Sequence, residues 1–109
     1  MANDGSTDDT TFLLLPGLEG TGELFRVFVE AAPPGATCHV VRYPDEPAWG
    51  YREHIEFVLG EHAPQNPFVV VGESFSGPVA VSVGAAHPEG LRGVVLCNSF
   101  VVRPFRPVF

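Results

Sequence analysis

The chain has 109 residues, of which 45% are hydrophobic and 17% charged, and its formal net charge is -7. This composition is that of one globular domain near the lower size limit for an independent core, and it excludes intrinsic disorder. The negative charge argues against nucleic acid and anionic membrane surfaces as partners, because the field of the protein repels phosphate.

The first ten residues, MANDGSTDDT, are polar and acidic, so we expect a solvated tail (residues 1–10) before a single domain (residues 11–109). No basic segment precedes an apolar stretch, which argues against a secretory signal. No apolar run approaches the roughly 20 residues of a membrane span, so no membrane association is expected. Cys38 and Cys97 match no metal-binding spacing. We expect two buried, reduced thiols, no metal and a cytoplasmic location.

The first half of the chain alternates between predicted strands and helices. In chain order these are a strand at Thr11–Leu15, a helix at Thr21–Ala32, a strand at Cys38–Arg42 and a helix at Tyr51–Leu59. Thr21 can cap the first helix and two prolines follow its end. Apolar residues fall on one face of the second helix, which Gly60 is expected to end.

The second half continues with strands at Phe68–Val71 and Gly93–Cys97, separated by the segment Gly77–His87. Within that segment, alternating valines favour a strand, whereas Pro78 near its start favours a helix. None of the predicted strands alternates cleanly with polar residues, which is typical of a parallel sheet covered on both faces. The order of elements predicts an α/β domain, followed by an extended arm (residues 101–109) with two prolines.

A serine stands where the third predicted strand ends, within VVVGESFSGPVAV (residues 69–81). A sharp turn from a buried strand into a helix exposes such a hydroxyl beside backbone N–H groups, which suits a developing oxyanion. The usual pattern is G-x-S-x-G, and here Gly72 precedes Ser74 while the small Ser76 takes the second glycine position. Ser74 is therefore the candidate nucleophile; the alternative is a serine that only caps a helix.

The glycines after the first strand do not fit nucleotide-binding motifs. Gly17, Gly20 and Gly22 have a spacing that differs from the dinucleotide fingerprint. Glu23 stands where a phosphate-binding loop has lysine, and its charge would repel phosphate. No cofactor is therefore expected.

The turn around Ser74 and the segment LLLPGLEGTGELF (residues 13–25) resemble the α/β-hydrolase family, as do VVRYPDE and LRGVVLCNSF. The resemblance covers about residues 11 to 102 and implies a serine esterase whose oxyanion hole is formed by the N–H groups of Leu18 and Phe75. It also implies a helix at Gly77–His87, helices on both faces of the sheet, and the strand order second, first, third, fourth. In that order the two cysteines would lie roughly 14 Å apart, beyond the about 7 Å that a disulfide spans.

The chain resembles only the N-terminal half of such an enzyme, because the family's acid and histidine follow the nucleophile in that order. After Ser74 the chain has only His87 and Glu89 of these types, at the far end of the third helix. Eleven helical residues place them roughly 15 Å below the serine, so neither is a triad candidate. His39 and His62 are expected at the opposite edge of the sheet.

His54 is the remaining histidine, and it lies in the first turn or two of the second helix, which begins at the same edge of the sheet as Ser74. With Asp45 or Glu46 as its orienter, it is a conceivable general base; the alternative is a boundary histidine packed beside apolar residues. A histidine from a partner chain is another candidate. Without any base, an oxyanion hole can still support residual catalysis of about 10³–10⁴ over water.

Two functions follow from these features. One is a serine hydrolase of small carboxylic or thio esters. Its candidate acyl-pocket walls are Phe25, Trp49, Phe75 and Phe100; the alternative for each is an ordinary core side chain. The other is a catalytically inert hydrolase half that acts as an assembly module. The fourth strand would be an exposed apolar edge, so we expect a homodimer or higher oligomer formed through this strand or the C-terminal arm.

Overall fold

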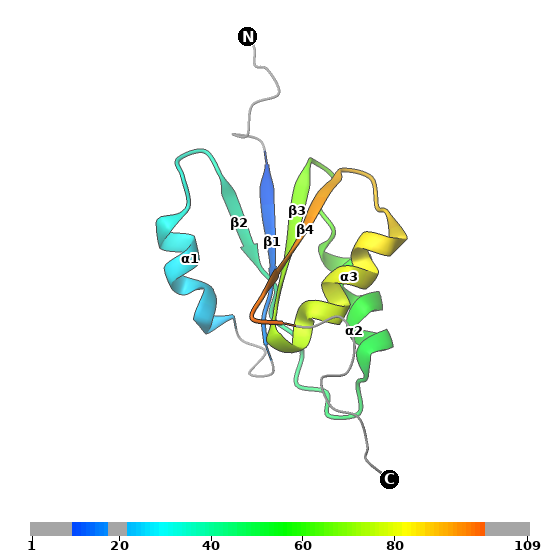
Figure 1. The fold of residues 1–109 in the computed structure, drawn as a ribbon. Coiled ribbons are helices and arrows are strands. Elements are labelled where there is room, and N and C mark those ends of the chain that lie inside the picture. The colour runs from blue at the N-terminus through cyan, green and yellow to red at the C-terminus, as the bar shows by residue number, and fades with distance from the viewer. Residues whose placement is uncertain (1–9, 18–21, 100–109) are drawn as a thin grey trace.

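The computed structural model describes residues 10–17 and 22–99, and it contains a four-stranded, all-parallel sheet (Figure 1). Its strands are β1 (Thr11–Leu15), β2 (Thr37–Val40), β3 (Phe68–Glu73) and β4 (Leu91–Cys97). Their order is β2-β1-β3-β4. The α/β class and the predicted strand order are therefore confirmed. Residues 1–9 of the expected tail and the whole expected arm (residues 101–109) lie outside the described residues.

Helical segments connect the strands. They are η2 (Glu23–Phe25) and α1 (Arg26–Ala31), then α2 (Tyr51–Phe57) and the π turn η3 (Val58–His62), and finally the 3-10 turn η4 (Ser74–Ser76) and α3 (Gly77–Ala86). The ambiguous third segment is thus a helix, with Pro78 in its first turn. Val79 and Val83 are fully buried in it, so tertiary packing overrides the low helix propensity of valine. None of the helices among these residues is long and apolar enough to cross a membrane.

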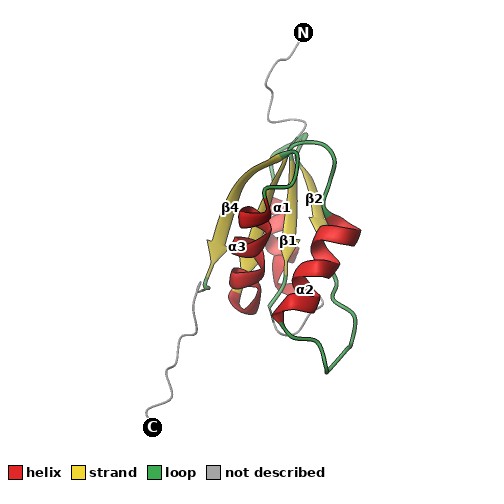
Figure 2. Cartoon of the chain, turned by 90° about the vertical axis from the view of Figure 1, so that its right-hand side faces the viewer, coloured by secondary structure: helices red, strands yellow, loops and turns green. Residues whose placement is uncertain are grey.

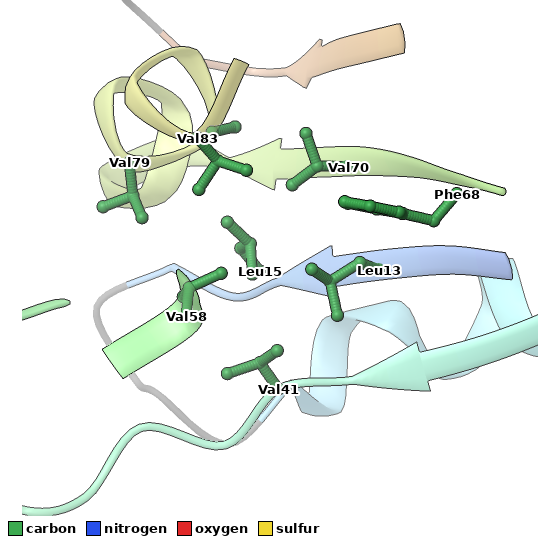
Figure 3. Packing of buried hydrophobic residues seen from close by; sticks show 9 residues of the cluster. Leu13, Leu15, Val41, Val58, Phe68, Val70, Val79 and Val83 are labelled. Atoms are coloured by element: carbon green, nitrogen blue, oxygen red, sulfur yellow. The ribbon is translucent and has the colours of Figure 1, made fainter. Parts of the chain in front are cut away.

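The main core lies between the sheet and the layer formed by α2, η3 and α3 (Figures 2 and 3). Its fully buried members include Leu13, Leu15, Val41, Val58, Phe68, Val70, Val79 and Val83. Burial of each such side chain contributes roughly 1.5–3 kcal/mol relative to exposure. This layer fixes the start of α3 against the end of β3, where Ser74 lies.

A smaller cluster occupies the other face of the sheet. Leu14 and Val71 follow core residues along their strands and therefore point to the opposite side, where they pack with Phe25. Phe28 of α1 meets Phe25 edge to face at 6.1 Å, but α1 buries none of its own residues. Val95 in β4 remains 45% exposed. This face is therefore covered only in part by the described residues.

Two predicted helix boundaries are wrong. Gly60 does not end the second helix, because the chain continues through it as the π turn η3 to His62. Gly60 is not among the glycines with a positive φ, so it lacks the left-handed backbone through which glycine commonly ends a helix. The first helix begins later than predicted, because a 3-10 turn at Glu23–Phe25 first brings Phe25 into the smaller cluster. Thr21, the expected cap, lies outside the described residues.

Candidate active site at the end of β3

Ser74 lies in the turn between β3 and α3 with a left-handed backbone conformation. Its φ is 54°, in a region that residues other than glycine occupy at a cost of roughly 1–3 kcal/mol. Glu73 before it is extended, and Gly77 after the 3-10 turn is already helical. The tight strand-to-helix turn predicted at Ser74 is therefore confirmed.

Gly72 is a glycine because the first turn of α3 packs directly against the end of β3. A Cβ at this position would lie 2.5 Å from the Ser76 carbonyl oxygen and 2.8 Å from the Ala80 Cβ. Both neighbours are backbone or core atoms that cannot move cheaply. The small residue two positions before Ser74 is thus required by the closeness of the helix.

The loop after β1 reaches the same turn. β1 and β3 are neighbouring parallel strands, with Leu15 beside Gly72, so their carboxyl ends lie together. The Gly17 N–H donates to Glu73 Oε1 at 3.0 Å. A Cβ built on Gly17 would lie only 3.4 Å from the Ser74 Cβ. The next residue of this loop, Leu18, was predicted to supply an oxyanion-hole N–H and lies outside the described residues.

Ser76 connects the turn to the same loop from within the core. It is fully buried, and its hydroxyl donates a hydrogen bond to the Pro16 carbonyl oxygen. That hydrogen is then committed, so the Tyr43 hydroxyl, 2.5 Å from Ser76 Oγ, must be the donor of the second bond. Burial raises the pKa of Tyr43 to about 12, against a smaller opposing effect of the Ser76 hydrogen bond. Tyr43 is therefore a neutral donor at physiological pH.

The segment after β4 contacts the other side of the turn. Cys97 is paired in register with Glu73, which brings the residues that follow β4 beside Ser74. Ser99 Oγ donates to the Ser74 carbonyl oxygen at 2.5 Å. Asn98 between them has a φ of 53°. Loops from two neighbouring strands thus flank Ser74.

Phe75, the second predicted oxyanion-hole residue, is held by Tyr51 of α2. The two rings stack with centroids 4.8 Å apart and an interplanar angle of 13°. The Tyr51 hydroxyl donates to the Phe75 carbonyl oxygen at 3.1 Å. The Phe75 N–H belongs to the first turn of a helical segment, where N–H groups have no partner within the helix. The geometry is compatible with the predicted role of that N–H.

His54 lies at this edge of the sheet, as predicted. Its ring meets Phe75 edge to face at 5.0 Å and Tyr43 at 4.6 Å. Its Nδ1 lies 2.8 Å from the Gly50 carbonyl oxygen, which only accepts, so Nδ1 carries the hydrogen and Nε2 holds a lone pair. The orienting group is thus a backbone carbonyl and not the exposed Asp45 or Glu46.

None of the side chains in residues 10–17 and 22–99 is hydrogen-bonded to the Ser74 hydroxyl. His39 and His62 pair with each other, with 2.9 Å between His39 Nε2 and His62 Nδ1. His87 ends α3 in a left-handed conformation. The structure therefore assigns no general base from within these residues.

The structure places the candidate acyl-pocket residues in different surroundings. Phe25 is only 4% exposed and belongs to the smaller core cluster, which fits the alternative of an ordinary core side chain. Trp49 packs edge to face against His54 and Phe57, with ring centroids 5.4 and 5.5 Å apart. Phe75 directly follows Ser74 in the chain and contacts His54, and Phe100 lies outside the described residues.

Glu73, Tyr43, Ser76 and Ser99 were not predicted as site residues. Glu73 and Ser76 flank the nucleophile position, but their types carry no signal of a partner nearly sixty residues earlier in the chain. The departure from glycine at Ser76 was the one available clue, since a hydroxyl there invites the question of its partner.

Neither metal-binding groups nor the comparison with known proteins assigns a further role to these residues. No group of three or more metal-ligating side chains occurs in the part of the chain that the structure describes. No protein-family model, no curated protein and no solved structure matches the chain.

Proposed function

We propose that this protein is a serine hydrolase that acts on small carboxylic or thio esters, with Ser74 as its nucleophile. The observation that carries this proposal is the left-handed backbone of Ser74 between β3 and α3. The total folding stability of a domain is about 5–15 kcal/mol, so a strained backbone that costs roughly 1–3 kcal/mol is a large loss. Such strain persists only where the surrounding structure imposes it, and it is found often at functional sites.

The same observation argues against the alternative of a capping serine. An N-cap residue has extended backbone and accepts a hydrogen bond from the first helical turn. Ser74 has a positive φ, and neither η4 nor α3 has a side-chain cap hydrogen bond. Capping therefore explains neither the conformation nor the contacts of this residue.

In the proposed reaction, Ser74 Oγ attacks the ester carbonyl carbon and its proton passes to a base. The carbonyl oxygen becomes an oxyanion that accepts hydrogen bonds from the N–H groups of Phe75 and Leu18. The alcohol or thiol then leaves with a proton, and water hydrolyses the acyl-enzyme in the reverse sense. His54 Nε2 or a histidine of a partner chain is the candidate base, and no resident cofactor or metal takes part.

A fluorophosphonate probe followed by peptide mass spectrometry tests the proposal. We expect covalent labelling at Ser74, because only an activated serine reacts, and no labelling in Ser74→Ala. Ser82→Ala is the matched control, since Ser82 is also half-buried but lies within α3. A folded wild-type chain that stays unlabelled would refute the proposal. His54→Ala with unchanged turnover of an activated ester would dismiss His54 as the base.

A second function, an assembly module, is favoured by the exposed edge strand β4. Val94, Val95 and Leu96 are 38%, 45% and 39% exposed in an unbroken apolar run. An apolar groove between α3 and β4 adjoins this edge; its lining includes Val81, Gly84, Leu91 and Val94. Such an edge pairs readily with another chain. We propose a homodimer or higher oligomer formed through β4 or residues 101–109.

Light scattering at micromolar concentration tests the assembly proposal, because a clean monomer would contradict it. A lysine in place of Val95 should weaken the association, since a charge on an exposed edge opposes strand pairing. Assembly without probe labelling would favour the inert module over the enzyme. Cys38 and Cys97 are free thiols, but both are only partly buried, so the expected full burial is wrong. We also propose a cytoplasmic location, which free thiols support.

A further inference from the structure

We infer that Glu73 and Ser76 are positioning residues that clamp the loop after β1 onto the nucleophile turn and so set the geometry of the oxyanion hole. This inference rests on the proposed role of Ser74. It concerns residues whose side chains are hydrogen-bonded to the backbone of the loop after β1. Their role is to fix one segment of the chain relative to another.

The Glu73 contact is the first half of this clamp. Gly17 is buried, and its N–H donates to Glu73 Oε1 at 3.0 Å. Glu73 immediately precedes Ser74, so the carboxylate and the nucleophile share one piece of backbone. The Gly17 N–H is thereby committed to Glu73 and unavailable to an oxyanion. The hydrogen bond therefore positions Gly17 at the start of the loop and does not itself supply an oxyanion donor.

The Ser76 contact is the second half of the clamp. The Ser76 hydroxyl donates to the carbonyl oxygen of Pro16, the residue before Gly17, and accepts from the Tyr43 hydroxyl. Ser76 is fully buried, so no solvent is available to replace either bond. A glycine at this position would fit the usual elbow pattern but would leave both partners without their hydrogen bond. The serine is thus explained by a positioning role.

The two contacts act on adjacent residues from opposite sides. Glu73 holds the N–H of Gly17, and Ser76 holds the carbonyl of Pro16. An oxyanion hole built from two segments works only if its donors lie at hydrogen-bond distance from one point. A misplacement of about 1 Å can cost on the order of 10²-fold in rate. Loss of the clamp should therefore slow acylation of Ser74 while substrate binding changes little.

The test compares Glu73→Gln, which keeps an oxygen acceptor, with Glu73→Ala, which removes it. The three readouts are the rate of fluorophosphonate labelling at Ser74, kcat and KM for an activated ester, and hydrogen exchange of the Gly17 amide. We expect Glu73→Gln to label within about twofold of wild type and Glu73→Ala at least about tenfold more slowly. KM should be unchanged, and Gly17 exchange should accelerate only in Glu73→Ala.

Ser76→Gly supplies a second, independent variant if Glu73→Ala fails to fold. It removes only the hydroxymethyl group and should also slow labelling at least about tenfold with KM unchanged. Urea unfolding of each variant separates slow labelling from loss of the fold.

Three results would overturn the inference and leave the proposed function intact. The first is labelling of Glu73→Ala at the wild-type rate. The second is a fall in the labelling rate of Glu73→Gln as large as in Glu73→Ala. The third is a rise in KM in place of a fall in kcat. A folded wild-type chain without any labelling would instead refute the proposed function. Gly17 exchange would then still decide whether the clamp exists as a structural contact.

Discussion

Replacement of Ser74 by glycine and by alanine measures the backbone strain on which the site depends. Ser74→Gly removes the side chain and with it the steric cost of a φ of 54°. Ser74→Ala removes only the hydroxyl and keeps the Cβ that causes the cost. The difference in unfolding free energy between the two variants therefore isolates the conformational strain from the chemistry of the hydroxyl group.

The expected size follows from two opposing effects. A left-handed conformation costs a residue with a Cβ roughly 1–2 kcal/mol, which glycine avoids. Against this, glycine lowers the free energy of unfolding by about 0.5–1 kcal/mol relative to alanine, because its unfolded chain has greater conformational freedom. Ser74→Gly should thus be more stable than Ser74→Ala by about 0–1.5 kcal/mol, centred near 0.75 kcal/mol, or a few degrees in Tm for a domain of about 100 residues.

Ser82 provides the matched pair, because it is a half-buried serine inside α3 that is not among the residues with a positive φ. In a helix interior, glycine is less stable than alanine by about 0.5–1 kcal/mol. Urea unfolding of the four variants should therefore give a glycine-minus-alanine difference of opposite sign at positions 74 and 82. The same sign at both positions would refute the strained turn.

Three further predictions concern the surroundings of the site. Gly72→Ala should lower the free energy of unfolding by about 1–3 kcal/mol in urea, because its Cβ would overlap Ser76 and Ala80. Tyr43 should ionise with a midpoint near its raised pKa of about 12, followed by ultraviolet absorbance. The neutral Tyr43 hydroxyl stabilises the folded state below the ordinary tyrosine pKa of about 10. This contribution to the free energy of unfolding is lost as the pH rises from there toward the folded pKa. His62 has a lowered pKa, chiefly through burial and then through the charge of His39. The neutral His62 ring contributes to the free energy of unfolding above its ordinary pKa of about 6.5, and this contribution is lost as the pH falls through the folded pKa. Urea unfolding at several pH values measures the loss.

Each of these predictions has its own control. Gly60→Ala meets nothing within 4 Å, so it should be neutral or stabilising by up to about 1 kcal/mol, and a large loss there would undermine the steric argument for Gly72. Tyr43→Phe should remove the late absorbance step; ionisation of both tyrosines near the ordinary pKa would contradict the buried environment of Tyr43. His62→Gln should lose less stability than wild type on acidification, and an equal loss would assign the pH effect to other groups.

The elements of the fold were largely predictable because their signals are local. Four apolar runs without polar alternation gave the strands and the α/β class, and the resemblance gave the order β2-β1-β3-β4. Gly77–Ala86 was ambiguous from its valines, since burial of Val79 and Val83 against the sheet decides a conformation that propensity alone does not. The error at Gly60 has the opposite origin, because glycine was expected to end the helix through a left-handed backbone that Gly60 does not adopt.

The site was predictable at Ser74 and less so around it. The small residues beside Ser74 constrain the turn locally, so the pattern G-x-S identifies it. The contacts of Glu73 with Gly17 and of Ser76 with Pro16 join residues nearly sixty positions apart. Such contacts arise from the pairing of β1 with β3, and a single sequence carries no signal for them.

The arrangement of the sheet explains why these contacts meet at one place. β3 lies between β1 and β4, so the loops that follow those two strands must emerge on either side of the turn at Ser74. A strained residue persists only where its surroundings over-determine its conformation. Here the closeness of α3 at Gly72, the Gly17 loop and Ser99 each restrict the turn independently. These restraints explain how the strained backbone of Ser74 is maintained, and that strain is the observation on which the proposed function rests.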